Sequence, residues 1–369
     1  MSKIIYNLAL LLLSGPLVTS AVAEEPPRPE DPKEVLLYPV QENGEAKYIN
    51  REGKVVIPGP FHWGSRPFRE GLAVVSRHRG KIGYINEKGE MVIAPRFAHA
   101  SDFSDGMARV SYDTKSWGYI DRTGRMVIEP RLGPQLTFFP FSEGLAVSRV
   151  DNSFGFIDRT GKVVIERKFT CAKDFSEGLA VVLVGDKYGY IDRNGRMVIK
   201  SKYYDADSFS EGLAKVRTGL IHKPRVFFIN PSGEALFGFD IRVRNAGSFH
   251  EGLATIEYWD AEHRFINRKV GVIDKKGNVV IEPTFETIFP FSDGLAAARK
   301  GTEDKLGYID RKGRFVIEMK FKMAFPFSNG VAMVRVGGET PFGSETAYID
   351  KKGNYIWAPT KDKPDRQNK

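Results

Sequence analysis

Short apolar runs alternate with turn residues along most of the chain, and two of these runs recur as fixed signatures. The first reads Phe, a polar residue, Glu or Asp, then Gly-Leu-Ala or Gly-Met-Ala, and begins at Phe68, Phe103, Phe141, Phe175, Phe209, Phe249 and Phe291, with a variant at Phe327. The second centres on an isoleucine before a polar turn, at Ile49, Ile85, Ile120, Ile157, Ile191, Ile229, Ile273, Ile309 and Ile349. Glycines of the first signature lie 34 to 42 residues apart. This regularity indicates a tandem repeat with a period near 36.

Each repeat predicts three short β-strands, as residues 72–75, 83–85 and 91–93 illustrate. The residues between the second and third strands have the chemistry of a hairpin loop. In the copy at 121–125 we expect Asp121 to accept backbone N–H groups and Gly124 to adopt a left-handed conformation. The Glu-Gly pair of the first signature predicts a second tight turn, which leads into the first strand.

The strands are apolar on successive residues rather than on alternate ones, as at 179–182. Both faces of each small sheet are therefore expected to be covered. This pattern predicts an all-β tandem repeat of about eight three-stranded antiparallel units. The units would form either a propeller-like ring or an open curved β-stack. The sequence contains nine hairpins but eight first signatures, which leaves an additional half-unit at one end. The sequence therefore does not decide between a closed ring and an open stack.

The first 23 residues are typical of a signal peptide: Lys3 is positive, residues 4–13 are mostly apolar, and Ala21 to Ala23 form a cleavage site. We expect cleavage after Ala23 and a periplasmic or secreted monomer that does not span the membrane. The expected divisions are a signal peptide at 1–23, a proline- and charge-rich linker at 24–45, the repeat domain at 46–357 and a charged tail at 358–369.

The formal net charge of +9 favours anionic partners. In an exported protein this points to an acidic protein or an anionic envelope polymer rather than to nucleic acid.

The paired signatures resemble the WG-repeat (KWG-repeat) proteins of bacteria, over about residues 46–357. The tryptophan of the motif survives only at Trp117, and the matching positions hold other large apolar residues such as Ile82 and Phe154. Trp117 is therefore interpreted as a packing residue. The resemblance implies a β-repeat architecture and an interaction role, and it implies no catalytic activity.

The sequence offers no catalytic constellation. No two of its six histidines have metal-ligand spacing, the single cysteine forms no zinc knuckle, and no nucleotide-binding or hydrolase motif occurs. We therefore predict no catalytic residues, no metal site and no cofactor.

Two features are candidates for binding. The first is a row of cations at the hairpin tips: Arg122, Arg125, Arg159, Lys162, Arg193, Arg196, Arg311 and Arg314. The row is interrupted by Glu87 and Glu90, and exposed turns favour charged residues in any case. The second is a loop in the sixth repeat that carries Tyr258, Trp259, His263 and Arg264, where the repeat is irregular. The alternative interpretation is that the sequence of this loop has varied without a functional role, because a repeat fold tolerates changes in its loops.

Two functional hypotheses follow. The first is an exported, non-catalytic scaffold that presents a repeat surface to a protein or an anionic envelope polymer. The second is an enzyme, for example a glycan hydrolase, with one site on the irregular fifth and sixth repeats. A catalytic residue is expected to depart from the repeat rather than to recur in every copy.

Overall fold

The computed structural model describes residues 36–42, 45–61, 65–77, 80–132, 137–219, 225–239, 243–259, 268–337 and 345–359. In these residues all regular secondary structure is β-strand. The expected signal peptide at 1–23, most of the linker and the tail from 360 lie outside the described residues.

The strands form nine small antiparallel sheets, here called blades 1 to 9 in chain order. Blades 1 and 2 have three strands each: β1 (Tyr38–Glu42), β2 (Glu45–Ile49) and β3 (Val55–Phe61), then β4 (Leu72–Arg77), β5 (Lys81–Asn86) and β6 (Met91–Phe97). Blades 3 to 5 have four each: β7 (His99–Ala100), β8 (Met107–Ser111), β9 (Ser116–Asp121) and β10 (Met126–Leu132); β11 (Thr137–Ser142), β12 (Leu145–Val150), β13 (Ser153–Asp158) and β14 (Val163–Phe169); β15 (Cys171–Ala172), β16 (Ala180–Val184), β17 (Lys187–Ile191) and β18 (Met197–Tyr203).

Blades 6 to 9 also have four strands each. They are β19 (Asp205–Ala206), β20 (Ala214–Thr218), β21 (Arg225–Ile229) and β22 (Ala235–Phe239); β23 (Val243–Ala246), β24 (Leu253–Trp259), β25 (Arg268–Asp274) and β26 (Val279–Phe285); β27 (Thr287–Ile288), β28 (Ala296–Arg299), β29 (Leu306–Ile309) and β30 (Phe315–Phe321); β31 (Met323–Ala324), β32 (Val331–Val336), β33 (Glu345–Asp350) and β34 (Tyr355–Trp357).

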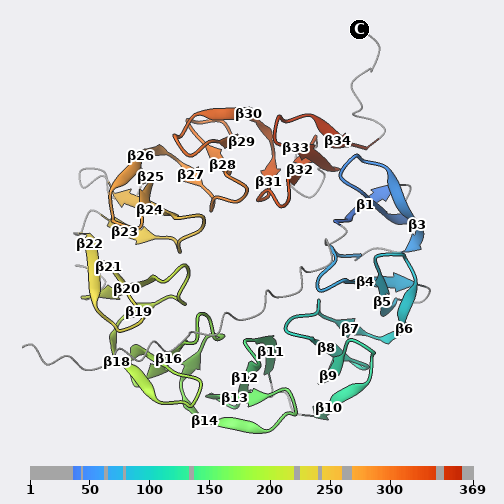
Figure 1. Cartoon of the computed structure of the whole chain (residues 1–369), viewed down its shortest axis with the longest axis horizontal. Helices are drawn as coiled ribbons and strands as arrows, with labels where there is room; N and C mark the ends of the chain where they lie inside the picture. The colour runs from blue at the N-terminus through green and yellow to red at the C-terminus, as the bar shows by residue number, and fades with distance from the viewer. Residues whose placement is uncertain are drawn as a thin grey trace, which may run out of the picture. The chain divides into compact units, whose positions relative to one another are not determined.

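The nine blades stand in a closed ring, which is a nine-bladed β-propeller (Figure 1). The prediction of an all-β propeller-like ring is confirmed. Each of the nine hairpins counted in the sequence belongs to one blade, so the apparent half-unit is the complete but shorter blade 1. In seven blades the structure adds a strand, only two residues long in five of them, on the inner side of the three that the sequence predicts (Figure 1).

Side chains, not a shared strand, join the first blade to the last. The ring of Tyr38 packs on that of Tyr348 with centroids 5.4 Å apart, and Val40 and Ile49 share a buried cluster with Val331. Both sheets keep their own strands, since β1 pairs with β2 and β34 with β33.

The same two signatures meet at almost every blade boundary. The phenylalanine of one blade packs on the aromatic ring that precedes the central isoleucine of the blade before it, as Phe209 does on Tyr190 at 5.1 Å. The hydroxyl of Tyr190 also donates a hydrogen bond of 2.8 Å to the carbonyl oxygen of Asp207 across that boundary. Burial of the ring raises the pKa of Tyr190, so the hydroxyl keeps its proton and remains a donor.

Blade 6 replaces the usual strand geometry with a different one. In a regular blade, such as blade 5, the outer strand is bulged around a glycine, and a Cβ on Gly189 would lie 2.6 Å from the carbonyl oxygen of Ile199. Blade 6 has Phe227 in this position, and its β21 pairs with β22 without the large bulge. Gly238 makes room for it, because a Cβ there would lie 2.3 Å from the ring of Phe227. In blade 6, which is the irregular fifth repeat of the sequence, the glycine and the large side chain have therefore exchanged places between two neighbouring strands.

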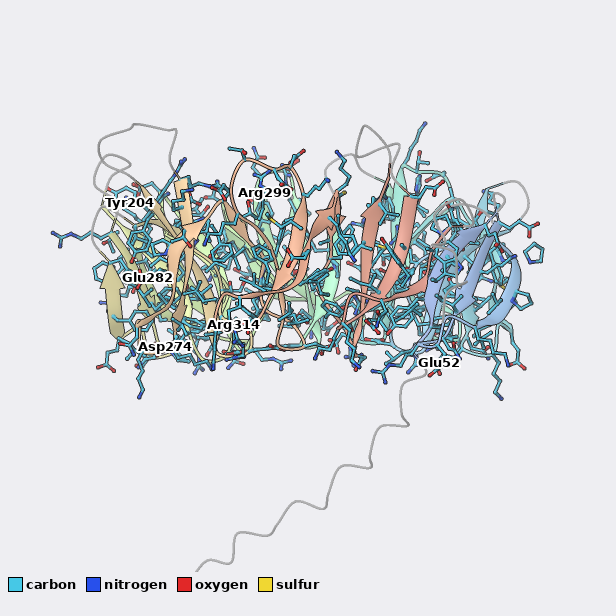
Figure 2. All side chains as sticks on the ribbon, turned by 90° about the horizontal axis from the view of Figure 1, so that it is seen from above. Glu52, Tyr204, Asp274, Glu282, Arg299 and Arg314 are labelled. Atoms are coloured by element: carbon cyan, nitrogen blue, oxygen red, sulfur yellow. The ribbon has the colours of Figure 1, made fainter. Side chains whose placement is uncertain are left out.

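The ring has two faces. Figure 2 places Glu52, Asp274 and Arg314, which belong to hairpin tips, on one of them, and Tyr204 and Arg299 on the other. We call the first the tip face.

Candidate functional site

The hairpin tips are closed by an aspartate or asparagine in the same way in all nine blades. In blade 3, Oδ1 of Asp121 accepts the backbone N–H groups of Thr123 and Arg125 at 3.0 and 3.1 Å. Gly124 has a φ of 86°, in the left-handed region. The predicted roles of Asp121 and Gly124 in the turn are confirmed.

The tight turn of the first signature holds two successive residues at positive φ, as a type I′ hairpin turn requires. In blade 5 these are Glu177 at 55° and Gly178 at 79°. The carboxylate of Glu177 then reaches the next blade and accepts the N–H of Gly212 at 2.9 Å. The same link from one turn to the next starts at Glu70, Asp105, Glu143, Glu177, Glu211, Glu251 and Asp293. Asn329, in the last turn, accepts a hydrogen bond from Arg51 of blade 1, whose sequence lacks the first signature.

Four of the predicted binding cations, Arg122, Arg159, Arg193 and Arg311, contact the turn of the preceding blade. Arg122, for example, donates a hydrogen bond of 2.6 Å to the carbonyl oxygen of Glu70. Glu87 occupies the equivalent place in blade 2, and the sequence of blade 1 lacks the first signature.

The other four predicted tip cations, Arg125, Lys162, Arg196 and Arg314, are exposed. Arg125 and Arg314 bind the aspartate of their own tip at 3.1 and 2.6 Å. In two of the three tips that have asparagine the partner is an acid: Asn86 donates to Glu90 at 2.8 Å and Asn230 to Glu234 at 3.1 Å, whereas blade 1 has Lys54 at this place. Contacts within the ring thus engage Arg125, Arg314 and the interrupting Glu90, whereas Lys162 and Arg196 contribute backbone N–H groups to their turns. A ligand for these cations stays a prediction.

The irregular loop of the sixth repeat is described only in part. Tyr258 lies in β24 and packs half-buried against the core between blades 6 and 7. Trp259 is the last residue of that strand, opposite Arg268. His263 and Arg264 lie outside the described residues.

A polar cavity of about 330 Å³ lies between blades 6 and 7. Strands β19 to β21 and β23 to β25 supply its walls. Four cations and two carboxylates line it: Lys215, Arg217, Arg244 and Arg268 with Asp205 and Glu257. A second cavity of about 160 Å³ adjoins it and shares Asn245, Glu257 and Arg268. We call the larger one the inter-blade cavity.

Lys215 joins three elements in the wall of this cavity. Its side chain is 8% exposed, and its Nζ contacts Asp207 Oδ2 at 2.9 Å and Asn245 Oδ1 at 2.8 Å. Lys173 of blade 5 binds the other oxygen of Asp207 at 3.1 Å. Burial by itself would raise the pKa of Asp207, but the two lysines hold it below its ordinary value.

The cavity also contains guanidinium groups. The Nε of Arg217 is buried and has no hydrogen-bond partner in the part of the chain that the structure describes. Arg268 Nε lies 3.7 Å from Glu257 Oε1. Asp205 stands opposite Arg217 in the strand ladder.

The sequence indicated that the fifth and sixth repeats are irregular but did not single out these side chains. A signal was present, because Lys215 follows Leu-Ala where blades 2, 4 and 5 have valine (Val74, Val147 and Val181). The convergence of Arg217 from β20 with Arg244 from β23 needs the ring, and no spacing in the sequence encodes it.

Within the described residues, no group of three or more His, Cys, Asp or Glu side chains is placed to hold a metal ion. None of these residues forms a helix long and apolar enough to cross a membrane.

The family profile described as WG containing repeat matches residues 48–81, 82–115, 117–152, 154–188, 188–219, 271–301 and 307–339. The unmatched stretch between 219 and 271 contains Arg244, Asn245, Glu257 and Arg268. A search of curated proteins finds no sequence match.

Solved structures with the same fold include the crystal structure of a eukaryotic initiation factor, at 11% identity and a TM-score of 0.61, over 88% of this chain and 96% of that one. BamB from Moraxella catarrhalis matches at 12% identity and a TM-score of 0.41, over 73% and 89% of the two chains. AztD from Citrobacter koseri matches at 10% and 0.38, over 87% and 95%. The first of these similarities concerns the fold alone, and nothing is argued from the other two.

Proposed function

This chain belongs to the family of WG-containing repeat proteins, and on that premise we propose that it is an exported, non-catalytic scaffold that binds an anionic envelope polymer. The observation that carries the proposal is the inter-blade cavity, where four cations face two carboxylates. On the tip face, by contrast, several cations are already engaged by neighbouring turns and by their own aspartates.

Export rests on the sequence features of residues 1–23. The mass of the mature protein, secreted from a bacterial host, tests it: a product beginning at Glu24 supports export, and an uncleaved chain in the cytoplasm contradicts it.

Binding is tested with the mature protein immobilised and exposed to polyglutamate, polyphosphate and polygalacturonate, with neutral dextran as the control. We expect at least one polyanion to be retained at low ionic strength and released at high ionic strength, because contacts between exposed charges are screened by salt. The proposal is contradicted if the immobilised protein retains none of the three polyanions better than it retains dextran.

Hydrolysis of a glycan is the second candidate function, because Asp205 and Glu257 both line the cavity. Release of reducing ends from a bound polysaccharide would favour it over a binding scaffold. Loss of that release on Glu257→Gln would assign the reaction to this cavity.

A further inference from the structure

We propose that the inter-blade cavity binds one carboxylated sugar residue, with its carboxylate against Arg217 and its hydroxyls against Asn245 and Glu257. This inference rests on the proposed function and names the chemical class of the polymer. It concerns residues that the sequence analysis did not single out.

The carboxylate position follows from Arg217. Arg217 lines the cavity, and its side chain forms no ion pair with another described side chain. A guanidinium group pairs with a carboxylate through two parallel hydrogen bonds. Arg244 and Arg268 line the same cavity and add positive potential.

The two acids of the cavity favour a hydroxyl-rich ligand. Glu257 and Asp205 accept hydrogen bonds from sugar hydroxyls, whereas they repel a dianion such as phosphate. Val226 is the one apolar side chain among the residues that line the larger cavity in the described part of the chain. Peptide anchors are usually apolar or aromatic, so this lining suits a sugar better than a protein segment.

Arg217 of blade 6 has no ion-pair partner among the described side chains, whereas the equivalent arginine of blade 8 has one. Arg217 stands opposite Asp205, and Arg299 has the equivalent place opposite Thr287 in blade 8. Arg299 binds Asp304 at 2.8 Å. Arg299 is therefore a matched control for Arg217.

The size of the cavity limits the ligand. Its volume of about 330 Å³ lies at the lower end of the range for small-molecule pockets, roughly 300–1,000 Å³. One monosaccharide unit fits this volume, and the adjoining cavity of about 160 Å³ offers space for the start of the next unit.

Calorimetric titration of the mature protein with glucuronate, glucose, phosphate and glutamate tests the inference. We expect glucuronate to bind at least about tenfold more tightly than the other three. We expect Arg217→Gln to weaken glucuronate binding about tenfold or more, and Arg299→Gln to leave it unchanged. Thermal unfolding of both variants shows whether the fold is retained.

Each other outcome overturns the inference. Phosphate binding as tightly as glucuronate would indicate a general anion site, and equally tight glutamate binding would indicate an acidic peptide. Equal binding by the Arg217→Gln variant would place the sugar elsewhere. If the protein retains polygalacturonate but Arg217→Gln does not weaken glucuronate binding, only this inference is contradicted. If glucuronate binds but no polyanion is retained, only the proposed function is contradicted.

Discussion

The hydroxyl of Tyr348 donates a hydrogen bond of 2.8 Å to the carbonyl oxygen of Pro39, and so joins two residues 309 positions apart in the chain. It repeats at the closing boundary the contact that Tyr190 makes with Asp207 inside the array. Closure of the ring therefore uses the same chemistry as every ordinary boundary that has a tyrosine.

Replacement of Tyr348 by phenylalanine tests this equivalence. A net hydrogen bond contributes about 0.5–1.5 kcal/mol, so Tyr348→Phe and Tyr190→Phe should each lower the free energy of unfolding by about that amount. Phe156 and Phe228 occupy the same position naturally, which shows that the core accepts the ring. Denaturant unfolding measures the effect. A loss for Tyr190→Phe without one for Tyr348→Phe would indicate an open ring.

The hydrogen bond that links one turn to the next is tested at Glu177. The tip of blade 6 supplies no cation to the turn of Glu177, because blade 6 has Pro231 where blade 3 has Arg122. Glu177→Ala should destabilise the fold by about 1–2 kcal/mol, since it removes the acceptor for Gly212 N–H. Glu177→Gln keeps an acceptor oxygen and should cost clearly less. Equal losses for the two variants, measured by denaturant unfolding, would argue against the link.

The contact between tip and turn is tested at Lys275 and Glu211. Lys275 Nζ lies 2.9 Å from the carbonyl oxygen and 3.0 Å from Oε2 of Glu211. Both side chains are partly exposed, so a double-mutant cycle with Lys275→Met and Glu211→Gln should give a coupling of about 0.2–1 kcal/mol. The coupling should fall when salt is added. A coupling of zero at low salt would mean that this pair does not stabilise the boundary.

Lys215, which lines the inter-blade cavity, forms an ion pair with Asp207. Lys215→Met should destabilise the protein by about 1–3 kcal/mol, because a half-buried carboxylate loses its nearest cation while Lys173 remains. The double variant with Asp207→Asn should recover part of this loss, since no uncompensated charge is left. Strictly additive losses in thermal or denaturant unfolding would contradict the pairing.

Acid should weaken the hairpin tips. Hydrogen bonds from the backbone N–H groups of Arg196 and Asn194 hold the pKa of Asp192 below its ordinary value. A lowered pKa in the folded state stabilises the fold above the unfolded pKa, about 3.9, and this stabilisation is lost as the pH falls through the folded pKa. Stability should therefore be level near neutral pH and fall below about pH 4.

Asp192→Asn checks that assignment. Asparagine keeps the acceptor oxygen, as Asn230 does in the next blade, but does not titrate. Unfolding measured against pH should show a shallower acid decline for this variant. An unchanged decline would mean that other carboxylates are responsible.

Much of the fold was predictable because its determinants are local. Gly124 and Asp121 make their turn with neighbours at most four residues away, and each repeat presents the same pattern to its own hairpin. The number of blades was not predicted: about eight units were expected, and the structure has nine because blade 1 is complete without a first signature. The charge row was visible too, but its role as contacts between blades was not.

The sequence by itself determined the repeat, its strands and its turns, because these depend on residues within one period. Only the tertiary structure decided that the ring closes and where its charges converge. Closure depends on whether small rotations between successive blades add up to a full turn, and no single repeat encodes that sum. Arg217 and Arg244 meet only because a blade boundary lies between them, so the inter-blade cavity is a property of the assembled ring.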